Sequence, residues 1–270
     1  MTLAVAAAYA DVVDLDRYPI DALESAVGRS MVEQGRDQLA RLGVCSLPGF
    51  VRPDAVYTMV AIAESRAAEA WRSGQTHTAY FEPPDPTVAT SDPRARLVRS
   101  AKRALACDLI PADAPLRRLY ESDDMTRFIA AVLDKPVLFR SADPLDCLEI
   151  AMFGDGDELG WHFDRSEFSV TMMLRPAECG GAFDYYPSLR TPADERYGAV
   201  GAALDDDGAN ATRLVSEPGT LAVFRGHHAL HRVAPVSGPA ARINAVLTYG
   251  DRADMKLNEL TQRLFYGRVA

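Results

Sequence analysis

Short apolar segments dominate the second half of the chain, and this pattern narrows the possible folds more than any other feature. After Pro136 these segments alternate with clusters of Gly, Pro and Asp. They read PVLFR, DCLEIAMFG, WHFD, FSVTMML, GAFDYYP, ATRLVS, TLAVFR, LHRVAPV and RINAVLTYG. Each segment has the length of a strand, and the residues between them form turns. Many short strands at close spacing are typical of an antiparallel sandwich or barrel.

The first half has a different hydrophobic pattern, with apolar residues at the three-to-four spacing of helices. We expect one structural unit in two parts: a mostly helical region, 1–135, that packs on a β-rich core, 136–270, with a C-terminal helix. The fold class is therefore mainly β with flanking helices (α+β). The expected elements are helices at 22–42, 53–73, within 98–133 and at 253–265, a strand at 44–50, a Pro-rich loop at 77–97 and an acidic surface turn at 203–210.

Within the Pro-rich loop the stretch 77–86 is a candidate lid, because long loops in compact domains often cover binding sites. Disorder or simple wrapping of the surface explains the same composition equally well. The Gly43 residue after the first helical segment is a typical C-terminal helix signal, and Pro53 suits the first turn of the second helix.

Charge and hydropathy exclude several classes of partner. The chain carries 29 Lys and Arg against 38 Asp and Glu, a formal net charge of −9. This balance argues against nucleic-acid binding, which needs a basic surface, and against docking on anionic lipid. The sequence contains no apolar stretch of membrane-spanning length, and its first residues lack the basic region of a signal peptide. We therefore expect a cytoplasmic protein with no membrane partner.

Four cysteines are scattered through the chain at positions 45, 107, 147 and 179. Their spacing matches no zinc motif. In a cytoplasmic protein of this length, we expect reduced and mostly buried thiols.

Two metal-ligand residue types stand two positions apart in the segment GWHFDRSEF. On a strand, residues i and i+2 point to the same face, so His162 and Asp164 converge. A third ligand has to come from a distant strand, and GHHALHRVAPV offers His231, with His227 and His228 as alternatives. Two imidazoles and one carboxylate on one face leave three coordination positions open. This set is the facial triad of non-haem Fe(II) oxygenases.

Arg242 follows His231 by a short turn and begins an apolar segment. If the two segments form adjacent strands, the guanidinium can point into the same cavity as the metal. A buried Arg binds a carboxylate through paired, charge-assisted hydrogen bonds. A dicarboxylate that chelates iron with its keto-acid end and reaches Arg242 with its other carboxylate has the geometry of 2-oxoglutarate.

The order of these motifs resembles the Fe(II)/2-oxoglutarate-dependent dioxygenases. The motifs are His-x-Asp, a Gly180–Gly181 step, a distant H-R-V-x-P-V and an Arg before an apolar strand. The longer stretches WHFDRSEFSVTMMLRPAECGGAFDYYPSLR and GTLAVFRGHHALHRVAPV are similar to the branch that contains radical halogenases of free amino acids and their hydroxylase relatives. The likeness extends over most of the chain. It implies a double-stranded β-helix (jelly roll), iron ligation by His162, Asp164 and His231, and 2-oxoglutarate contact by Arg242.

The residue at position 164 separates two reaction classes in that branch. Halogenating members carry Gly or Ala there, which frees a position on iron for chloride. Because this chain has Asp164, the resemblance implies hydroxylation of an unactivated C–H bond of a free amino acid or similar small molecule in specialised metabolism. The reaction consumes O2 and 2-oxoglutarate and releases succinate and CO2. Alternatives are desaturation, cyclisation, a carrier-bound or protein-bound substrate, and a non-catalytic cupin-like binding module.

Three more residues are candidates for contacts in the cavity. Asn244 lies two residues beyond Arg242, shares its face and is expected to support the cosubstrate or to hydrogen-bond within the core. Thr171 and Tyr185 lie on strands near the ligands, where they contact cosubstrate or substrate or simply pack.

Arg165 directly follows the iron carboxylate. Lysine-acting relatives need acidic groups for the substrate amine, so an Arg here indicates a substrate with an anionic or neutral side chain. The alternative is a surface ion pair with Glu167 or Asp184. The expected partner is thus a small molecule, with neither nucleic acid nor membrane, and a homodimer is left open.

Overall fold

The computed structural model of the chain describes residues 8–83 and 85–270. Its centre is an antiparallel sheet with the strand order β1-β11-β7-β14-β5-β3-β6-β12-β9-β10, to which β2 adds beside β3. Two short two-stranded sheets pair β13 with β8 and β15 with β4. The strands are β1 (Val44–Leu47), β2 (Trp71–His77), β3 (Val98–Ala106), β4 (Phe139–Arg140), β5 (Leu148–Phe153), β6 (Glu158–His162), β7 (Ser169–Arg175), β8 (Cys179–Gly180), β9 (Phe183–Tyr186), β10 (Thr212–Leu214), β11 (Leu221–Phe224), β12 (Leu230–Val233), β13 (Val236–Ser237), β14 (Arg242–Leu247) and β15 (Tyr249–Gly250).

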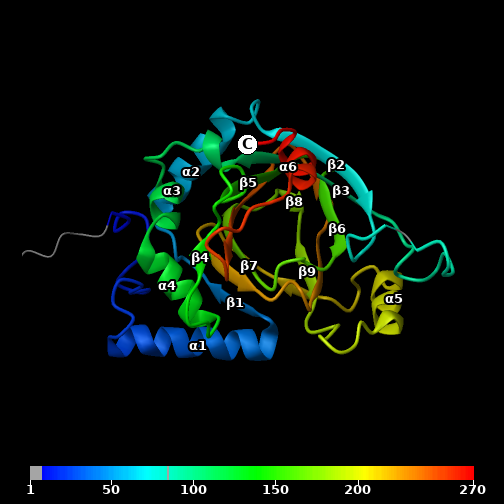
Figure 1. Cartoon of the computed structure of the whole chain (residues 1–270). Coiled ribbons are helices and arrows are strands. Elements are labelled where there is room, and N and C mark those ends of the chain that lie inside the picture. Colours follow the sequence, from blue (N-terminus) through cyan, green and yellow to red (C-terminus); the bar gives the residue numbers. More distant parts are fainter. Residues whose placement is uncertain (1–7, 84) are drawn as a thin grey trace, which may run out of the picture.

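The sheet curls until strands near its two ends meet through their side chains. Phe183 of β9 and Phe224 of β11 lie edge to face, with ring centroids 5.1 Å apart. Together with Val44 and Tyr185 they form a small apolar cluster between the two edges. The strands therefore surround an interior, as Figure 1 shows, and the expected jelly roll with flanking helices is confirmed.

Alternation along the strands separates the interior from the helix-covered side. In β5, Ile150 and Met152 belong to the large core beneath the helices, whereas Ala151 and Phe153 face the interior. Figure 1 shows α1 to α4 together along one side of the sheet and α5 on the opposite side. The helices are α1 (Ala26–Leu42), α2 (Pro53–Ser65), α3 (Pro115–Tyr120), α4 (Asp123–Val132), α5 (Tyr197–Asp205) and α6 (Glu259–Tyr266), with a 3-10 turn η1 (Cys107–Leu109).

The first predicted helix has the expected ends. The Ser25 side chain accepts a hydrogen bond from the Gly28 backbone amide, which caps α1 at its start. Gly43 ends it in the left-handed conformation, with φ of 74°. The strand that follows, β1, pairs with β11, so the N-terminal region enters the main sheet.

Two helical predictions in the first half are wrong in part. The helix expected over 53–73 ends at Ser65, and β2 begins at Trp71. The region 98–133 opens with strand β3, which lies between β5 and β6 in the sheet. The segment VRSAKRALA has good helix formers, but pairing with two neighbouring strands overrides that local preference.

Other local predictions differ in detail. The acidic stretch 203–210 does not lie wholly in a surface turn, because Ala203 and Leu204 are buried in α5, a helix that the sequence analysis did not predict. The closing helix is confirmed as the shorter α6. Both the 1–135 region and the 136–270 region contribute strands to the main sheet.

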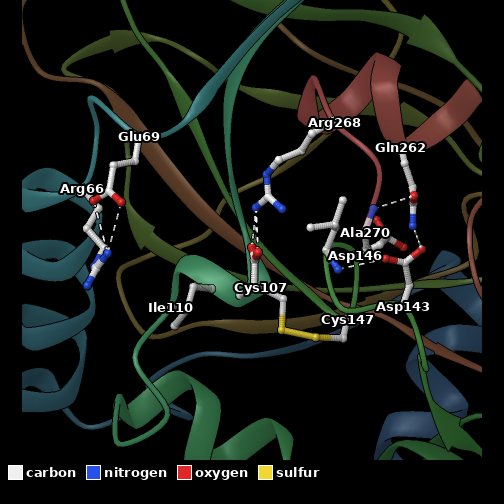
Figure 2. A network of polar contacts seen from close by, with 12 residues as sticks. Arg66, Glu69, Cys107, Ile110, Asp143, Asp146, Cys147, Gln262, Arg268 and Ala270 are labelled. Carbon is white, nitrogen blue, oxygen red and sulfur yellow. Dashed lines mark hydrogen bonds and ion pairs between the residues drawn. A yellow bond between two sulfur atoms is a disulfide. The ribbon is translucent and has the colours of Figure 1, made fainter. Parts of the chain in front are cut away.

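The prediction of reduced thiols is wrong for two of the four cysteines. Cys107 and Cys147 form a disulfide between η1 and the loop that precedes β5 (Figure 2). They are 40 residues apart in sequence but sit at adjacent ends of neighbouring strands, which no sequence spacing reveals. Cys45 is buried and Cys179 is exposed, both as free thiols. No helix among the described residues is long and apolar enough to cross a membrane.

Candidate metal centre

Two neighbouring strands bring the predicted ligands together. His162 ends β6, and His231 lies directly opposite it in β12, so their ring centroids are 4.1 Å apart. Asp164 follows two residues after His162. Its Oδ1 lies 3.6 Å from Nε2 of His162 and 3.5 Å from Nε2 of His231. One donor atom from each residue lies within 4.8 Å of the others, which is a group able to hold a single metal ion.

Backbone carbonyls orient both imidazoles toward the centre. Nδ1 of His162 lies 2.8 Å from the Gly160 carbonyl oxygen, and Nδ1 of His231 lies 2.9 Å from that of Ala229. A carbonyl oxygen only accepts, so each Nδ1 carries the proton and each Nε2 presents a lone pair. This is the tautomer that a metal ligand needs.

Burial and mutual charge set the protonation of the group. Burial, with the neighbouring His231, lowers the pKa of His162 to about 4, so this imidazole is neutral at pH 7. Burial opposes ionisation of Asp164, but the charge of His231 and His162 in their doubly protonated form outweighs it and holds the pKa of that carboxyl well below its usual range. A neutral imidazole beside an ionised carboxylate is the form that binds a divalent cation.

The second carboxylate oxygen of Asp164 is fixed from two sides. The Ser169 hydroxyl donates to Oδ2 at 3.0 Å. Gly226 lies against the same atom, and a Cβ built on Gly226 would be 1.9 Å from it. The sequence analysis missed Gly226, whose only signal was a Gly between a strand and the GHHALH histidines.

Neither alternative histidine joins the centre. His227 directs Nδ1 to the Asp164 carbonyl oxygen at 3.0 Å, so it contacts backbone rather than a metal. His228 is partly buried beside it, with ring centroids 5.0 Å apart. Among the described residues, the cluster able to hold a metal comprises His162, Asp164 and His231.

Arg242 is a buried cation that has no carboxylate beside it among residues 8–83 and 85–270. The residue is 4% exposed, its Nε has no hydrogen-bond partner, and its guanidinium lies 5.5 Å from the Phe153 ring centroid. Burial lowers its pKa to about 10. Gly181 of the Gly-Gly step, at φ of 63°, allows this close packing, since a Cβ there would lie 3.2 Å from Cδ of Arg242. Such a charge fits an anionic ligand.

The guanidinium lines a pocket that adjoins the metal-binding group. Ser169, which donates to Asp164, lines it, and so do Phe183 and Phe224, whose ring centroids lie 5.5 and 4.9 Å from that of His231. A ligand with two acidic ends can therefore meet both Arg242 and the triad. The polar residues lining this pocket with Arg242 are Ser169, Thr171, Ser216, Thr220 and Asn244.

The predicted contacts Asn244 and Thr171 thus share the pocket with Arg242, although Asn244 also donates to the Ala245 carbonyl at 3.3 Å. Thr220, which the sequence analysis missed, has a buried hydroxyl without a hydrogen-bond partner there. Tyr185 lies opposite His231 in the β9–β12 ladder, and its ring packs on Phe224 with centroids 5.4 Å apart.

Arg165 makes neither of the surface ion pairs considered for it. Its guanidinium is exposed and donates to the Phe81 carbonyl at 2.8 Å. Glu167 pairs instead with Lys135, and Asp184 pairs with two other arginines.

The candidate lid stretch 77–86 reaches the metal-binding group through His77 and Phe81, to which the sequence analysis gave no individual role. His77, the last residue of β2, stacks on Phe81 with ring centroids 4.2 Å apart. Phe81 in turn meets His162 edge to face at 5.2 Å. The loop that follows β2 therefore covers one side of a predicted metal ligand. The only sequence signal was a His and aromatic residues at the start of a Pro-rich segment.

Comparison with known proteins agrees with this geometry. A family model described as Halogenase D matches residues 28–265. A search of curated proteins finds no match.

Solved structures share the fold at low sequence identity. AviO1 from Streptomyces viridochromogenes Tue57 is 19% identical, with a TM-score of 0.55 over 85% of this chain and 97% of that chain. An oxidoreductase of the 2OG-Fe(II) oxygenase family from Burkholderia pseudomallei is 18% identical, with a TM-score of 0.51 over 82% and 91%. The epimerase SnoN, in complex with Fe3+, alpha ketoglutarate and nogalamycin RO, is 16% identical, with a TM-score of 0.56 over 83% and 84%. The fold is therefore that of the 2OG-Fe(II) oxygenases.

Proposed function

The chain belongs to the Halogenase D family, and on this premise we propose that it is an Fe(II)/2-oxoglutarate-dependent oxygenase that hydroxylates an unactivated C–H bond. The proposed substrate is a free amino acid or a similar small molecule. The observation that carries the proposal is a His-Asp-His group together with a buried Arg242 that has no carboxylate beside it in the described part of the chain.

Hydroxylation is favoured over halogenation by the carboxylate of Asp164. Its Oδ1 faces Nε2 of both histidines, where it would occupy the coordination position that a chloride ion needs. The Ser169 hydroxyl holds the other oxygen, so the carboxylate is fixed in this orientation. The match to a family model named for halogenation therefore does not require that this chain, which keeps the Asp164 carboxylate, is itself a halogenase.

The cofactors follow from the donor set. His162, Asp164 and His231 would hold Fe(II), and Arg242 would pair with the distal carboxylate of 2-oxoglutarate. Once bound, iron and 2-oxoglutarate supply the oxidising chemistry with O2, and succinate and CO2 are the co-products. The protein's own residues bind, orient and shield. The rings of Phe183 and Phe224 keep water from His231 and from the pocket wall.

The proposed substrate carries an anionic or neutral side chain. Arg165 supports this, because it follows the metal carboxylate directly and is exposed beside Phe81, in the loop that covers His162. An Arg→Ala change at 165 should weaken binding of such a substrate without changing 2-oxoglutarate affinity. Unchanged substrate affinity would remove Arg165 from the site.

Two measurements test the proposed function. Anaerobic addition of Fe(II) and 2-oxoglutarate should give a weak visible charge-transfer band, and its absence would favour a non-catalytic binding module. Aerobic incubation with a panel of free amino acids should release succinate and give a product heavier by one oxygen atom. A chlorinated product in the presence of chloride would overturn the hydroxylase assignment, and a product lighter by two hydrogen atoms would indicate desaturation or cyclisation.

A matched variant makes the first measurement specific. Asp164→Ala removes the carboxylate, so the anaerobic complex should be weaker and hydroxylation should be lost. Asp251→Ala, at an exposed position after β15, should behave as wild type. No substrate-stimulated succinate release across a wide panel would count against a free amino acid and in favour of a carrier-bound or protein-bound substrate.

A further inference from the structure

A buried chain of hydrogen bonds runs from the Pro-rich loop to the metal-binding group. Nε2 of His77 lies 2.6 Å from the Ser100 hydroxyl oxygen. That oxygen accepts a hydrogen bond from the Gly160 amide at 3.0 Å, and the Gly160 carbonyl accepts one from Nδ1 of His162 at 2.8 Å. The chain thus crosses three strands, from β2 through β3 to β6.

The partners define a single direction for the protons. Nδ1 of His77 faces the Thr78 carbonyl at 2.9 Å, so it carries the ring proton and leaves Nε2 as an acceptor. The Ser100 hydroxyl then donates to His77, and its lone pair is free for the Gly160 amide. Each donor in this arrangement meets an acceptor. The Gly160 N–H and C=O belong to two consecutive peptide groups, so the link to His162 acts by fixing the Gly160 backbone.

Packing around the hydrogen-bonded residues restricts their movement. His77, Ser100 and His162 are all buried. A Cβ built on Gly160 would lie 2.5 Å from the Arg99 carbonyl oxygen, so the β3–β6 contact excludes a side chain at that position. Phe81 packs on both His77 and His162 and closes the group from the loop side.

We propose that His77 and Ser100 are positioning residues for the metal centre: by holding the Gly160 backbone in place they fix the ring of His162 and the direction in which its Nε2 faces the metal. This inference rests on the proposed iron site. Partners that orient a ligating His change metal affinity by about 10- to 100-fold when they are removed. Neither His77 nor Ser100 needs to touch the metal for this effect.

The test measures metal binding in the absence of cosubstrate and O2, with Co(II) as the probe. Metal-free protein is titrated anaerobically with Co(II), and the dissociation constant and the visible ligand-field spectrum are recorded. Ser100→Ala removes the hydroxyl that links His77 to Gly160, and Ser100→Thr keeps a hydroxyl at this position. His77→Phe keeps a ring that stacks on Phe81 but removes the acceptor.

Ser73→Ala is the matched control. Ser73 lies in the same β2–β3 ladder opposite Lys102. Its hydroxyl contacts the Lys102 backbone carbonyl, which is not part of the hydrogen-bond chain from His77 to His162. We expect Ser100→Ala and His77→Phe to weaken Co(II) binding about 10- to 100-fold and to shift the spectrum. Ser100→Thr and Ser73→Ala should match wild type.

Two outcomes would overturn the inference. One is wild-type affinity and an unchanged spectrum in both Ser100→Ala and His77→Phe. The other is a lower Tm in these variants with unchanged Co(II) affinity of the folded protein, which would make the chain merely structural. If Ser100→Ala does not fold, His77→Phe and Ser100→Thr decide the question. Wild-type protein that binds no Co(II) would overturn the proposed function itself, so the two failures are distinguishable.

Discussion

The carboxylate of Asp164 lies directly against the bare Cα of Gly226. A Cβ on Gly226 would come within 1.9 Å of Oδ2, and the Gly226 carbonyl also accepts a hydrogen bond from the Asp164 amide at 3.1 Å. Because Oδ1 of the same carboxylate faces both histidines, displacement of Oδ2 would also turn Oδ1 away from them. The Asp164 carboxylate can therefore keep this orientation only when residue 226 is glycine.

Replacing Gly226 by Ala should weaken metal binding through Asp164. We expect the affinity for Co(II) to fall by roughly 10- to 100-fold, the range seen when groups that orient metal ligands are changed. In an Asp164→Ala background the same substitution should lower the affinity much less, since the carboxylate is absent and only the contact with Cβ at 3.0 Å remains. Co(II) titration of the four proteins in this cycle measures the coupling.

Gly74→Ala provides the control for a glycine in a strand. A Cβ at Gly74 meets no atom within 4 Å, so Co(II) affinity should not change. Equal losses on adding Gly226→Ala to wild type and to Asp164→Ala would contradict the direct contact.

Arg242→Met separates ligand binding from stability. Loss of one partner of a buried charge pair reduces the free energy of binding by about 2–5 kcal/mol, so the affinity for 2-oxoglutarate should fall at least ~30-fold. The ligand-free protein should keep or raise its Tm, because an unpaired buried charge is replaced by an apolar side chain of similar length. Calorimetric titration and thermal melts with and without 2-oxoglutarate measure both effects.

Arg252→Met, at an exposed surface ion pair with Asp254, should change neither quantity appreciably. A lower Tm of Arg242→Met combined with unchanged 2-oxoglutarate affinity would refute the assigned role of Arg242.

Three carboxylates beside α6, those of Asp143, Asp146 and Glu149, should make the stability of the fold depend on pH. Removal from water, together with the nearby charges of Glu149 and Asp143, raises the pKa of Asp146 to about 7, although the Tyr266 hydroxyl donates to it at 2.7 Å. Figure 2 shows Asp146 near Asp143, to the right of the disulfide. The native state therefore holds a proton between about pH 4 and pH 7 that the unfolded chain has lost.

Stability from this group is present below pH 4 and is lost as the pH rises through 7. The unfolding free energy of wild type should fall relative to that of Asp146→Asn by on the order of 1 kcal/mol per pH unit in this window. Urea unfolding at pH 5, 6, 7 and 8 measures the difference. Asp113→Asn, at an exposed position, should follow wild type. Parallel pH profiles for wild type and Asp146→Asn would show that the group does not titrate there.

Reduction of the disulfide should destabilise the fold. Cys107 and Cys147 enclose 40 residues of chain, and the loop-entropy relation gives about 4 kcal/mol for a loop of this size. Cys107→Ser with Cys147→Ser, or a reductant on wild type, should lower the urea midpoint accordingly. Cys179→Ser, which replaces an exposed free thiol, should leave the midpoint in place. An unchanged midpoint on reduction would mean that the cross-link adds nothing to stability.

The strand-rich second half could be predicted because alternation and turn residues are local signals. His162 and Asp164 were predictable as a pair for the same reason, since residues two apart share a face of a strand. Strand β3 could not be predicted, because its residues suit a helix and its pairing with β2, β5 and β6 holds it extended. The disulfide escaped prediction because its cysteines meet through the pairing of strands remote in sequence.

The sequence by itself determined the residue types of the site: two histidines, one carboxylate and one arginine in a chain of strands. The family resemblance already implied His231 rather than His227 or His228, and the strand register of the tertiary structure places it opposite His162. Only the tertiary structure decided the supporting parts, namely the space at Gly226, the unpartnered hydroxyl of Thr220 and the link from His77 to the metal ligand. These depend on distances of a few ångströms between segments far apart in the chain, which residue order does not encode locally.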